Sequence, residues 1–399
     1  MTRLEVALFI QRNANLGLEK LARLLFPRTK ATIEKLRIHR GNILVLRTGN
    51  IGDIACTMLA LAALRENFPG SRICLITSPG GARLPGAPEV LSGLSLVDEI
   101  VTFHLEDLKD RSYVRSLVAN LRRRRFDLFV HLPQERASLS RLLRDLAFAG
   151  LLGAQGVVGF KLAYHFPLFD LRTLKDFEPS QPEAGRLLEI LRRAGIHPSR
   201  SYELALPPAA IRQADDLLKA YVDNGRPIIG IQARAKEGAK NWPMAKFAEL
   251  CRKLQRSFAP LFVFTGGPAD RQLLENLSAT FPGDKVVAAG LANIQDTMAL
   301  ISRCQVFISV DTGPMHLAAL IGVPLVALFS ARQFKTMWDP FSPDAVVLRK
   351  SVPCELCFQA ECEHGSCMEA ISVDEVFDAV TSHLPQGQKD FSGKVSRGT

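Results

Sequence analysis

The chain has 399 residues, of which 47% are hydrophobic and 23% are charged, and it contains eight cysteines. This length is roughly two to three times that of an ordinary domain, so it excludes a small disulfide-stabilised fold and predicts two domains with large cores. No stretch approaches the roughly 18 consecutive apolar residues of a membrane-spanning helix, and the N-terminus lacks the basic head and apolar run of a secretory signal. The sequence therefore predicts a cytoplasmic protein.

The net charge of +10 favours anionic partners, and the charge is unevenly distributed. The first forty residues hold nine basic and three acidic side chains, which leaves about +6 in this segment. Four leucines, at positions 18, 21, 24 and 25, recur there at helical spacing. Two interpretations of this basic amphipathic N-terminal extension (1–40) stay open: a helix lying on an anionic membrane, and a surface helix packed on the protein.

Short apolar runs alternate with helical patterns from Gly41 onward. The first predicted strands span residues 42–47, 72–77, 97–103 and 126–132, with helices predicted at 55–67 and 112–125. A second series of strands follows at residues 227–232, 261–265, 285–288, 306–310 and 325–329. Strands separated by helix-length segments predict right-handed crossovers and parallel sheets. We therefore expect an α/β protein with two parallel-sheet domains, at 41–205 and 206–384, and a disordered tail at 385–399.

The first predicted strand leads directly into a glycine-rich turn that contains Gly49, Asn50, Gly52 and Asp53. Such a turn exposes backbone N–H groups at the carboxyl edge of a sheet, where α/β proteins bind ligands. Its spacing matches neither the dinucleotide-binding fingerprint nor a P-loop. Two roles fit Asp53, which stands where a helix N-cap belongs: a cap for the following helix, or a general base.

A second turn of this kind follows the predicted strand 306–310. It contains Asp311, Thr312, Gly313 and His316, and a helix of small residues comes next. Free N–H groups and the positive end of a helix dipole favour a diphosphate at such a position. A lone histidine at a helix start is often structural, but next to these polar residues we expect His316 to contact a ligand.

Two further loops at predicted strand ends carry charged residues. The loop after residues 228–232 contains Arg234, Lys236 and Lys240, which suit either a departing phosphate or a solvated basic loop. Asp270 follows a pair of glycines after strand 261–265, where a carboxylate can accept hydrogen bonds from ribose hydroxyls.

Several segments together resemble the heptosyltransferases of glycosyltransferase family nine, bacterial enzymes that build the inner core of lipopolysaccharide. The resemblance covers residues 41–380 and rests on ILVLRTGNIGDIACTMLALAALRENFPG, FDLFVHLPQ, VVGF, KNWP, FTGGPAD and VFISVDTGPMHLAALIGVPLVALF. It implies a GT-B architecture, in which two Rossmann-like domains face a cleft, the N-terminal one holding the acceptor and the C-terminal one the nucleotide-sugar. It also implies inverting transfer with no metal and no other cofactor.

The resemblance also implies roles for single residues. Asp53 would be the catalytic base and Lys240 the cation on the donor phosphates, while the acceptor-side loop would contain Gly49, Asn50 and Gly52. The implied donor-binding residues are Asp311, Thr312, Gly313, His316 and Asp270. Asp270 falls at or near an adenosine-binding acidic position that is commonly Glu in the family, and residues 232–234 also depart from the family pattern.

Four of the eight cysteines are clustered, at Cys354, Cys357, Cys362 and Cys367. Thiols at this spacing suit a structural zinc or iron–sulfur site, whereas the implied chemistry needs no metal. Reduced thiols are the alternative, because disulfides are rare in a reducing cytosol.

These features predict an inverting, metal-independent glycosyltransferase. We expect it to move a heptose from an ADP-linked nucleotide-sugar donor onto a lipid-linked saccharide acceptor of the lipopolysaccharide type. Its site would lie at the cytoplasmic face of the inner membrane, and we expect no nucleic-acid partner. Two alternatives stay open: a sugar-nucleotide epimerase of the same fold, which needs no acceptor, and a non-catalytic nucleotide-sugar-binding protein, against which the presence of Asp53 argues.

Overall fold

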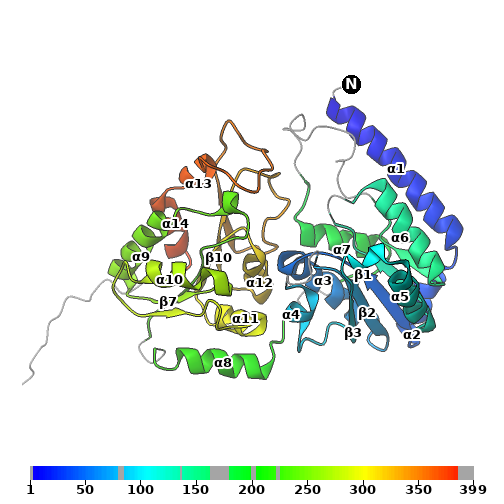
Figure 1. Cartoon of the computed structure of the whole chain (residues 1–399), viewed down its shortest axis with the longest axis horizontal. Helices are drawn as coiled ribbons and strands as arrows, with labels where there is room; N and C mark the ends of the chain where they lie inside the picture. Colours follow the sequence, from blue (N-terminus) through cyan, green and yellow to red (C-terminus); the bar gives the residue numbers. More distant parts are fainter. Residues whose placement is uncertain are drawn as a thin grey trace, which may run out of the picture.

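The computed structural model describes residues 3–79, 85–134, 137–161, 179–198, 204–221 and 225–384, with side chains from residue 12 onward. Figure 1 shows two α/β halves that lie side by side, the N-terminal half in blue to green and the C-terminal half in green to red. Within these ranges, no helix combines the length and the apolar character needed to cross a bilayer. The tail predicted to be disordered, 385–399, lies outside the described residues.

The first half contains a five-stranded parallel sheet with the strand order β3-β2-β1-β4-β5. Its strands are β1 (Asn42–Leu46), β2 (Arg72–Thr77), β3 (Glu99–Thr102), β4 (Leu128–His131) and β5 (Gly156–Val158). Alternate residues of β1 enter two separate cores, because Ile43 packs on one face of the sheet and Leu44 on the other. One face is covered by α3 (Ile51–Asn67), α4 (Ala87–Leu91) and α7 (Glu183–Arg193), and the other by α5 (Arg111–Arg123) and α6 (Leu139–Leu151).

Two N-terminal helices, α1 (Arg3–Leu25) and α2 (Thr29–Ile38), lie against this first half (Figure 1). Their contacts with it bury the apolar side chains of Leu18, Phe26, Ile33 and Leu36. The extension is therefore packed on the protein, as one of the two interpretations of its sequence expected. Leu24 and Leu25 stay exposed on α1.

The second half contains a six-stranded parallel sheet with the order β11-β10-β9-β6-β7-β8. Its strands are β6 (Ile228–Gln232), β7 (Leu261–Phe264), β8 (Lys285–Val287), β9 (Val306–Val310), β10 (Leu325–Phe329) and β11 (Ala345–Arg349). One face packs against α8 (Pro208–Leu218), α11 (Ile294–Ser302) and α12 (Gly313–Ile321), and the other against α9 (Met244–Phe258), α10 (Arg271–Ser278) and α14 (Val373–Thr381). The structure also contains three short 3-10 turns and a one-turn helix. These are η1 (Asp107–Lys109), η4 (Gly238–Lys240), η5 (Pro268–Asp270) and α13 (Ser366–Glu369).

The expectation of two parallel α/β sheets is confirmed, with differences at the ends of elements. Strands β5 and β11 were not predicted, and two helices begin one turn earlier than expected, α3 at Ile51 and α12 at Gly313. Helix α3 already includes Gly52 and Asp53, and α12 already includes Gly313. The residues before them, Asn50 and Thr312, are extended N-caps, so each helix begins within its glycine-rich turn.

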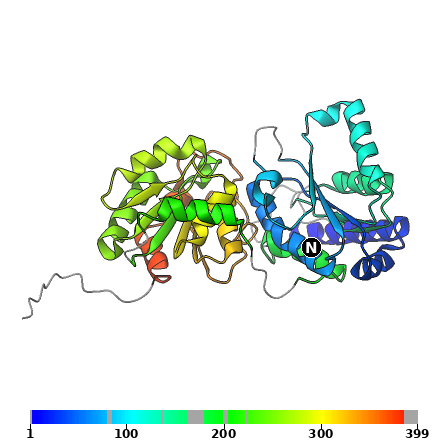
Figure 2. The ribbon, with the colours of Figure 1, turned by 90° about the horizontal axis from the view of Figure 1, so that it is seen from below.

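Each sheet has one point at which its strand order reverses. In each sheet the strand order reverses beside the first strand, between β1 and β4 and between β6 and β9, and ligands bind at the carboxyl ends of such strand pairs. The halves meet where α3 packs on α12 and α4 on α11, and Figure 2 shows the two halves side by side from below. Gln295 on α11 links the halves, since its Nε2 donates a hydrogen bond of 2.7 Å to the carbonyl of Val90.

Candidate active site

The first glycine turn connects β1 to α3 and holds Asp53 in a fixed position. The N-cap of α3 is Asn50, and Asp53 is the third residue of the helix, so its predicted place as the N-cap is wrong. Asp53 still caps the helix, because its Oδ2 accepts a hydrogen bond of 3.0 Å from the backbone N–H of Asn50. Gly49 has a φ of 138°, and a Cβ at this position would overlap the Asp53 carboxylate.

A buried network of charges supports Asp53 from the side of the sheet. Arg47, at the end of β1, is fully buried; its Nη2 lies 3.0 Å from Asp53 Oδ1, and its Nη1 lies 3.2 Å from Glu183 Oε1. Glu183 begins α7 and also pairs with Arg186 at 2.6 Å. Both arginines donate to the carbonyl oxygen of Pro133, in the loop after β4.

The sequence did not predict this network. Arg47 offered one signal, because a charged residue ends an otherwise apolar strand directly before the glycine turn. Glu183 and Arg186 offered none, since a pair of opposite charges three residues apart is typical of an exposed helix surface. Their burial follows from tertiary packing: α7 lies against α3, and the backbone N–H of Glu183 bonds Met337 in the other half at 3.0 Å.

The environment raises the pKa of Asp53. Burial is the largest cause, and the nearby Glu183 carboxylate adds to it, whereas Arg47 and the Asn50 amide act in the opposite direction. A carboxylate whose pKa is raised toward neutrality is a better proton acceptor than an ordinary exposed aspartate. The geometry and the charge balance therefore suit a general base.

The second glycine turn connects β9 to α12 and carries a buried lysine beside it. Lys240, at the end of η4, places its Nζ 2.9 Å from Asp311 and 3.1 Å from Glu237. Burial alone would lower the pKa of Lys240, but the attraction of these two carboxylates outweighs it and the pKa is raised. Lys240 is therefore a fixed positive charge. Glu237, which the sequence did not single out, also pairs with Arg332.

His316 lies on α12 at the contact between the halves. Burial lowers its pKa to about 4, and although Asp311 opposes this shift, the imidazole is neutral at pH 7. Its Nδ1 lies 3.5 Å from the thiol of Cys56 on α3, and its ring meets Trp338 edge-on with centroids 6.0 Å apart. A neutral imidazole can donate or accept a hydrogen bond here but adds no positive charge.

The two glycine turns touch each other across the halves. A Cβ on Gly313 would lie 2.6 Å from the Ile51 side chain, and one on Gly52 would lie 3.6 Å from the Cα of Gly313. The structure therefore brings together most of the predicted site residues: Gly49, Asn50, Gly52, Asp53, Lys240, Asp311, Thr312, Gly313 and His316.

Asp270 and the clustered cysteines lie apart from these contacts. Asp270 ends η5, after β7, where its Oδ2 accepts 2.9 Å from the backbone N–H of Gly267 and its Oδ1 lies 4.0 Å from Arg234. The four clustered thiols carry no disulfide, and Cys362 contacts the nearby His364 at 3.7 Å. In the part of the chain that the structure describes, no three His, Cys, Asp or Glu side chains form a group that could hold a metal ion.

Comparison with known proteins gives one family. A model described as glycosyltransferase family 9 (heptosyltransferase) matches residues 114–368, which is more than half of the chain. The solved structure of an Escherichia coli ADP-heptose lipopolysaccharide heptosyltransferase II superposes with a TM-score of 0.60 at 21% identity, covering 86% of this chain and 98% of that one. This likeness confirms the predicted GT-B fold.

Curated relatives align over different lengths. A lipooligosaccharide heptosyltransferase 2 of Haemophilus influenzae is 25% identical over 77% of this chain and 88% of its own length. The protein of the same description from Campylobacter jejuni is 28% identical over 40% of this chain. That second alignment spans about half of the Campylobacter protein, 52% of its length.

Proposed function

Because the chain belongs to glycosyltransferase family 9, we propose that it is an inverting, metal-independent heptosyltransferase. The donor is ADP-heptose and the acceptor is a lipid-linked saccharide of the lipopolysaccharide type. The observation that carries this proposal is the contact between the two glycine turns. One turn holds Asp53, whose pKa is raised, and the other begins with Asp311, the partner of the buried Lys240. The descriptions of the Haemophilus and Escherichia proteins support the choice of donor and acceptor.

The proposed reaction is a single displacement at the anomeric carbon. The acceptor hydroxyl transfers its proton to Asp53 as its oxygen forms the new bond to the sugar. The bond from the anomeric carbon to the β-phosphate oxygen breaks on the opposite side, and its electron pair stays on the departing ADP. This back-side attack inverts the anomeric configuration.

The second half stabilises the charge that develops on ADP. Lys240 supplies a positive charge, and the first backbone N–H groups of α12 point their dipoles toward the same place. Lys240 exchanges part of its contact with Asp311 and Glu237 for the diphosphate. In this proposal the fixed cation and the amides do the work that a metal ion does in other transferases, and Asp270 binds the ribose of ADP.

The first test concerns the base. Asp53→Asn should reduce heptose transfer from ADP-heptose by about a hundredfold or more, while ADP binding is retained, because general-base catalysis contributes on this scale. Asp296→Asn is a matched control, since Asp296 is also the third residue of a helix with an asparagine N-cap, in α11. Equal activities of the two variants would reduce Asp53 to a helix-capping residue.

The second test concerns the donor cation. Lys240→Ala should weaken ADP binding by about tenfold or more, the usual worth of a hydrogen bond to a charged group. Lys236→Ala removes an exposed cation from the same loop and should leave the affinity unchanged. Isothermal titration calorimetry measures the ADP affinity of both variants. Transfer by the unmodified protein should also survive a chelator; loss that magnesium or manganese restores would refute the metal-free mechanism.

The acceptor also bears on where the protein works. A lipid-linked acceptor is embedded in a membrane, so the proposal places the protein in the cytoplasm, in contact with the inner membrane surface. The basic N-terminal extension supports such contact, since each lysine or arginine near an anionic surface contributes about 1 kcal/mol.

A further inference from the structure

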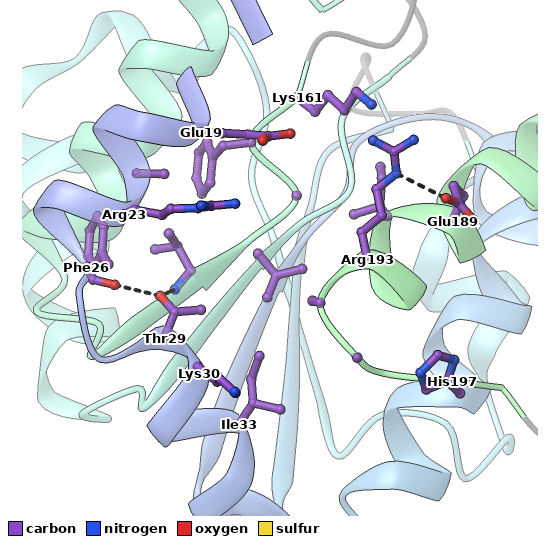
Figure 3. Close-up of a pocket in the computed structure, with 18 of the residues that line it drawn as sticks. Glu19, Arg23, Phe26, Thr29, Lys30, Ile33, Lys161, Glu189, Arg193 and His197 are labelled. Carbon is purple, nitrogen blue, oxygen red and sulfur yellow. Dashed lines mark hydrogen bonds and ion pairs between the residues drawn. The ribbon is translucent and has the colours of Figure 1, made fainter. Parts of the chain in front are cut away.

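A large cavity lies between the N-terminal helices and the first half. It has a volume of about 1100 Å³ and is bounded by α1, α2, the end of β5 and α7 (Figure 3). Part of its wall is apolar, with Phe26, Ile33, Val158 and Ile190. Residues 114–368, which the family model matches, do not include α1 or α2, so one side of this cavity comes from outside the matched region.

Cations dominate the charged part of the lining. Six lysines and arginines face three carboxylates, so the lining carries a net charge of six minus three, or +3: Arg23, Lys30, Arg37, Lys161, Arg186 and Arg193 against Glu19, Glu34 and Glu189. Glu189 is already bound by Arg192 at 2.7 Å and Arg193 at 3.0 Å. Among the residues that the structure describes, the side chains of Arg23, Lys30 and Lys161 have no ion-pair or hydrogen-bond partner.

Two of these cations face each other. Figure 3 shows the Arg193 guanidinium extending toward Lys161, while Arg23 and Lys30 point into the same space from α1 and α2. Burial lowers the pKa of Lys161, and the charge of Arg193 lowers it further, although Glu19 and Glu189 offset part of this effect. An anion between the two cations would reduce their mutual repulsion. It would also offset the cost of burying the charge of Lys161.

Exposed apolar side chains adjoin the cavity residues in sequence. Leu24 is 77% exposed and Leu25 is 55% exposed next to Arg23, and Ile38 is 80% exposed next to Arg37. Large apolar side chains beside cations are typical of a surface that lies in a lipid headgroup region. Binding of a freely soluble anion would not account for these exposed apolar side chains.

We propose that this cavity binds the phosphate headgroup of an anionic membrane lipid. Lys161, after β5, and Arg193, at the end of α7, contact the phosphate on one side. Arg23 and Lys30 contact it from α1 and α2, and the apolar wall packs against the first carbons of the acyl chains. The inference goes beyond the proposed transferase activity and does not depend on it, because binding needs neither ADP-heptose nor Asp53.

The test compares two double variants that remove equal charge. Arg23→Gln with Lys30→Gln removes two exposed cavity cations, whereas Arg12→Gln with Lys20→Gln removes two exposed cations of α1 outside the cavity. Sedimentation with phosphatidylcholine vesicles that contain or lack phosphatidylglycerol measures binding. We expect the cavity pair to weaken binding to the anionic vesicles about tenfold or more and the control pair at most about threefold.

Lys161→Gln provides a second variant, because this residue is half-buried and contributes little to general surface charge. It should also weaken vesicle binding. Equal losses in the cavity and control pairs, with an unaffected Lys161→Gln, would show a nonspecific attraction and overturn the proposal. Thermal stabilisation by glycerol 3-phosphate that requires Lys161, combined with equal vesicle binding by all variants, would identify a soluble phosphate as the ligand and refute the lipid assignment.

Discussion

At the residue scale, the proposed base depends on Arg47. This fully buried cation bridges Asp53 and Glu183, so each carboxylate is stabilised by the arginine and destabilised by the other. The two respond differently: the pKa of Asp53 is raised, whereas the pKa of Glu183 is lowered despite its burial, because Arg186 and Arg47 both pair with it. Glu183 is therefore a positioning residue that keeps Arg47 in place and raises the basicity of Asp53.

This arrangement predicts the pH dependence of a Glu183→Gln variant. Removing the negative charge removes one cause of the raised Asp53 pKa, so that pKa falls. Since the base acts when deprotonated, the acid limb of the kcat/KM profile should move to lower pH. Loss of one partner from a buried ion pair should also reduce the free energy of unfolding, by about 3 kcal/mol.

The matched control is Glu189→Gln, which removes a carboxylate from the same helix that pairs only with Arg192 and Arg193 among the described side chains. Its acid limb should stay where it is in the unmodified protein. An acid limb that does not move in Glu183→Gln, or that moves to higher pH, would contradict the assigned role.

At the element scale, the turn from β1 to α3 needs a glycine for two reasons. Gly49 has a positive φ, which other residues adopt only with strain, and its missing side chain leaves the space that the Asp53 carboxylate occupies. Gly49→Ala should therefore lower stability by about 1–3 kcal/mol and also displace Asp53. We expect transfer to fall by about tenfold or more.

Gly153 separates these two effects. It has a φ of 76°, and no atom lies within 4 Å of a Cβ built on it. Gly153→Ala should show a comparable loss of thermal stability with normal transfer activity. Normal transfer in Gly49→Ala as well would mean that the Asp53 carboxylate does not need the space above Gly49.

The elements also show how far a sequence can predict a structure. Strands β1, β2, β9 and β10 were predictable because they are continuous apolar runs bounded by glycine, proline or polar residues. Strand β5 was missed because it has only three residues. Strand β11 is an apolar run bounded by Pro343, Asp344 and Lys350, so it meets the same criterion and could have been predicted. The site residues on the two turns were predictable from local pattern, whereas Glu183 was not, because its burial depends on tertiary packing against α3, Arg47 and the segment that contains Met337.

At the scale of the whole molecule, the N-terminal helices belong to the folded body. Deleting residues 1–40 would remove the buried side chains of Leu18, Phe26, Ile33 and Leu36, each worth about 1.5–3 kcal/mol. This loss approaches the total stability of about 5–15 kcal/mol that is typical of a protein domain. The truncated protein should therefore be insoluble, or should unfold at a much lower temperature.

Deleting residues 1–17 provides the comparison, since it keeps all four buried side chains. This shorter deletion should leave the melting temperature close to that of the full chain. The soluble yield and the melting temperature of both truncated proteins test these expectations. Equal stability of the longer deletion would show that α1 and α2 contribute nothing to the core.

The contact between Gly52 and Gly313 also constrains how this protein can evolve. The two glycines are far apart in sequence and belong to different halves, yet a Cβ on Gly313 would already overlap the side chain of Ile51. A side chain at position 313 is therefore acceptable only if the residue at position 51 becomes smaller, whereas a Cβ on Gly52 would make ordinary contact. Across diverging sequences, we expect positions 51 and 313 to change together and to restrict recombination between the two halves.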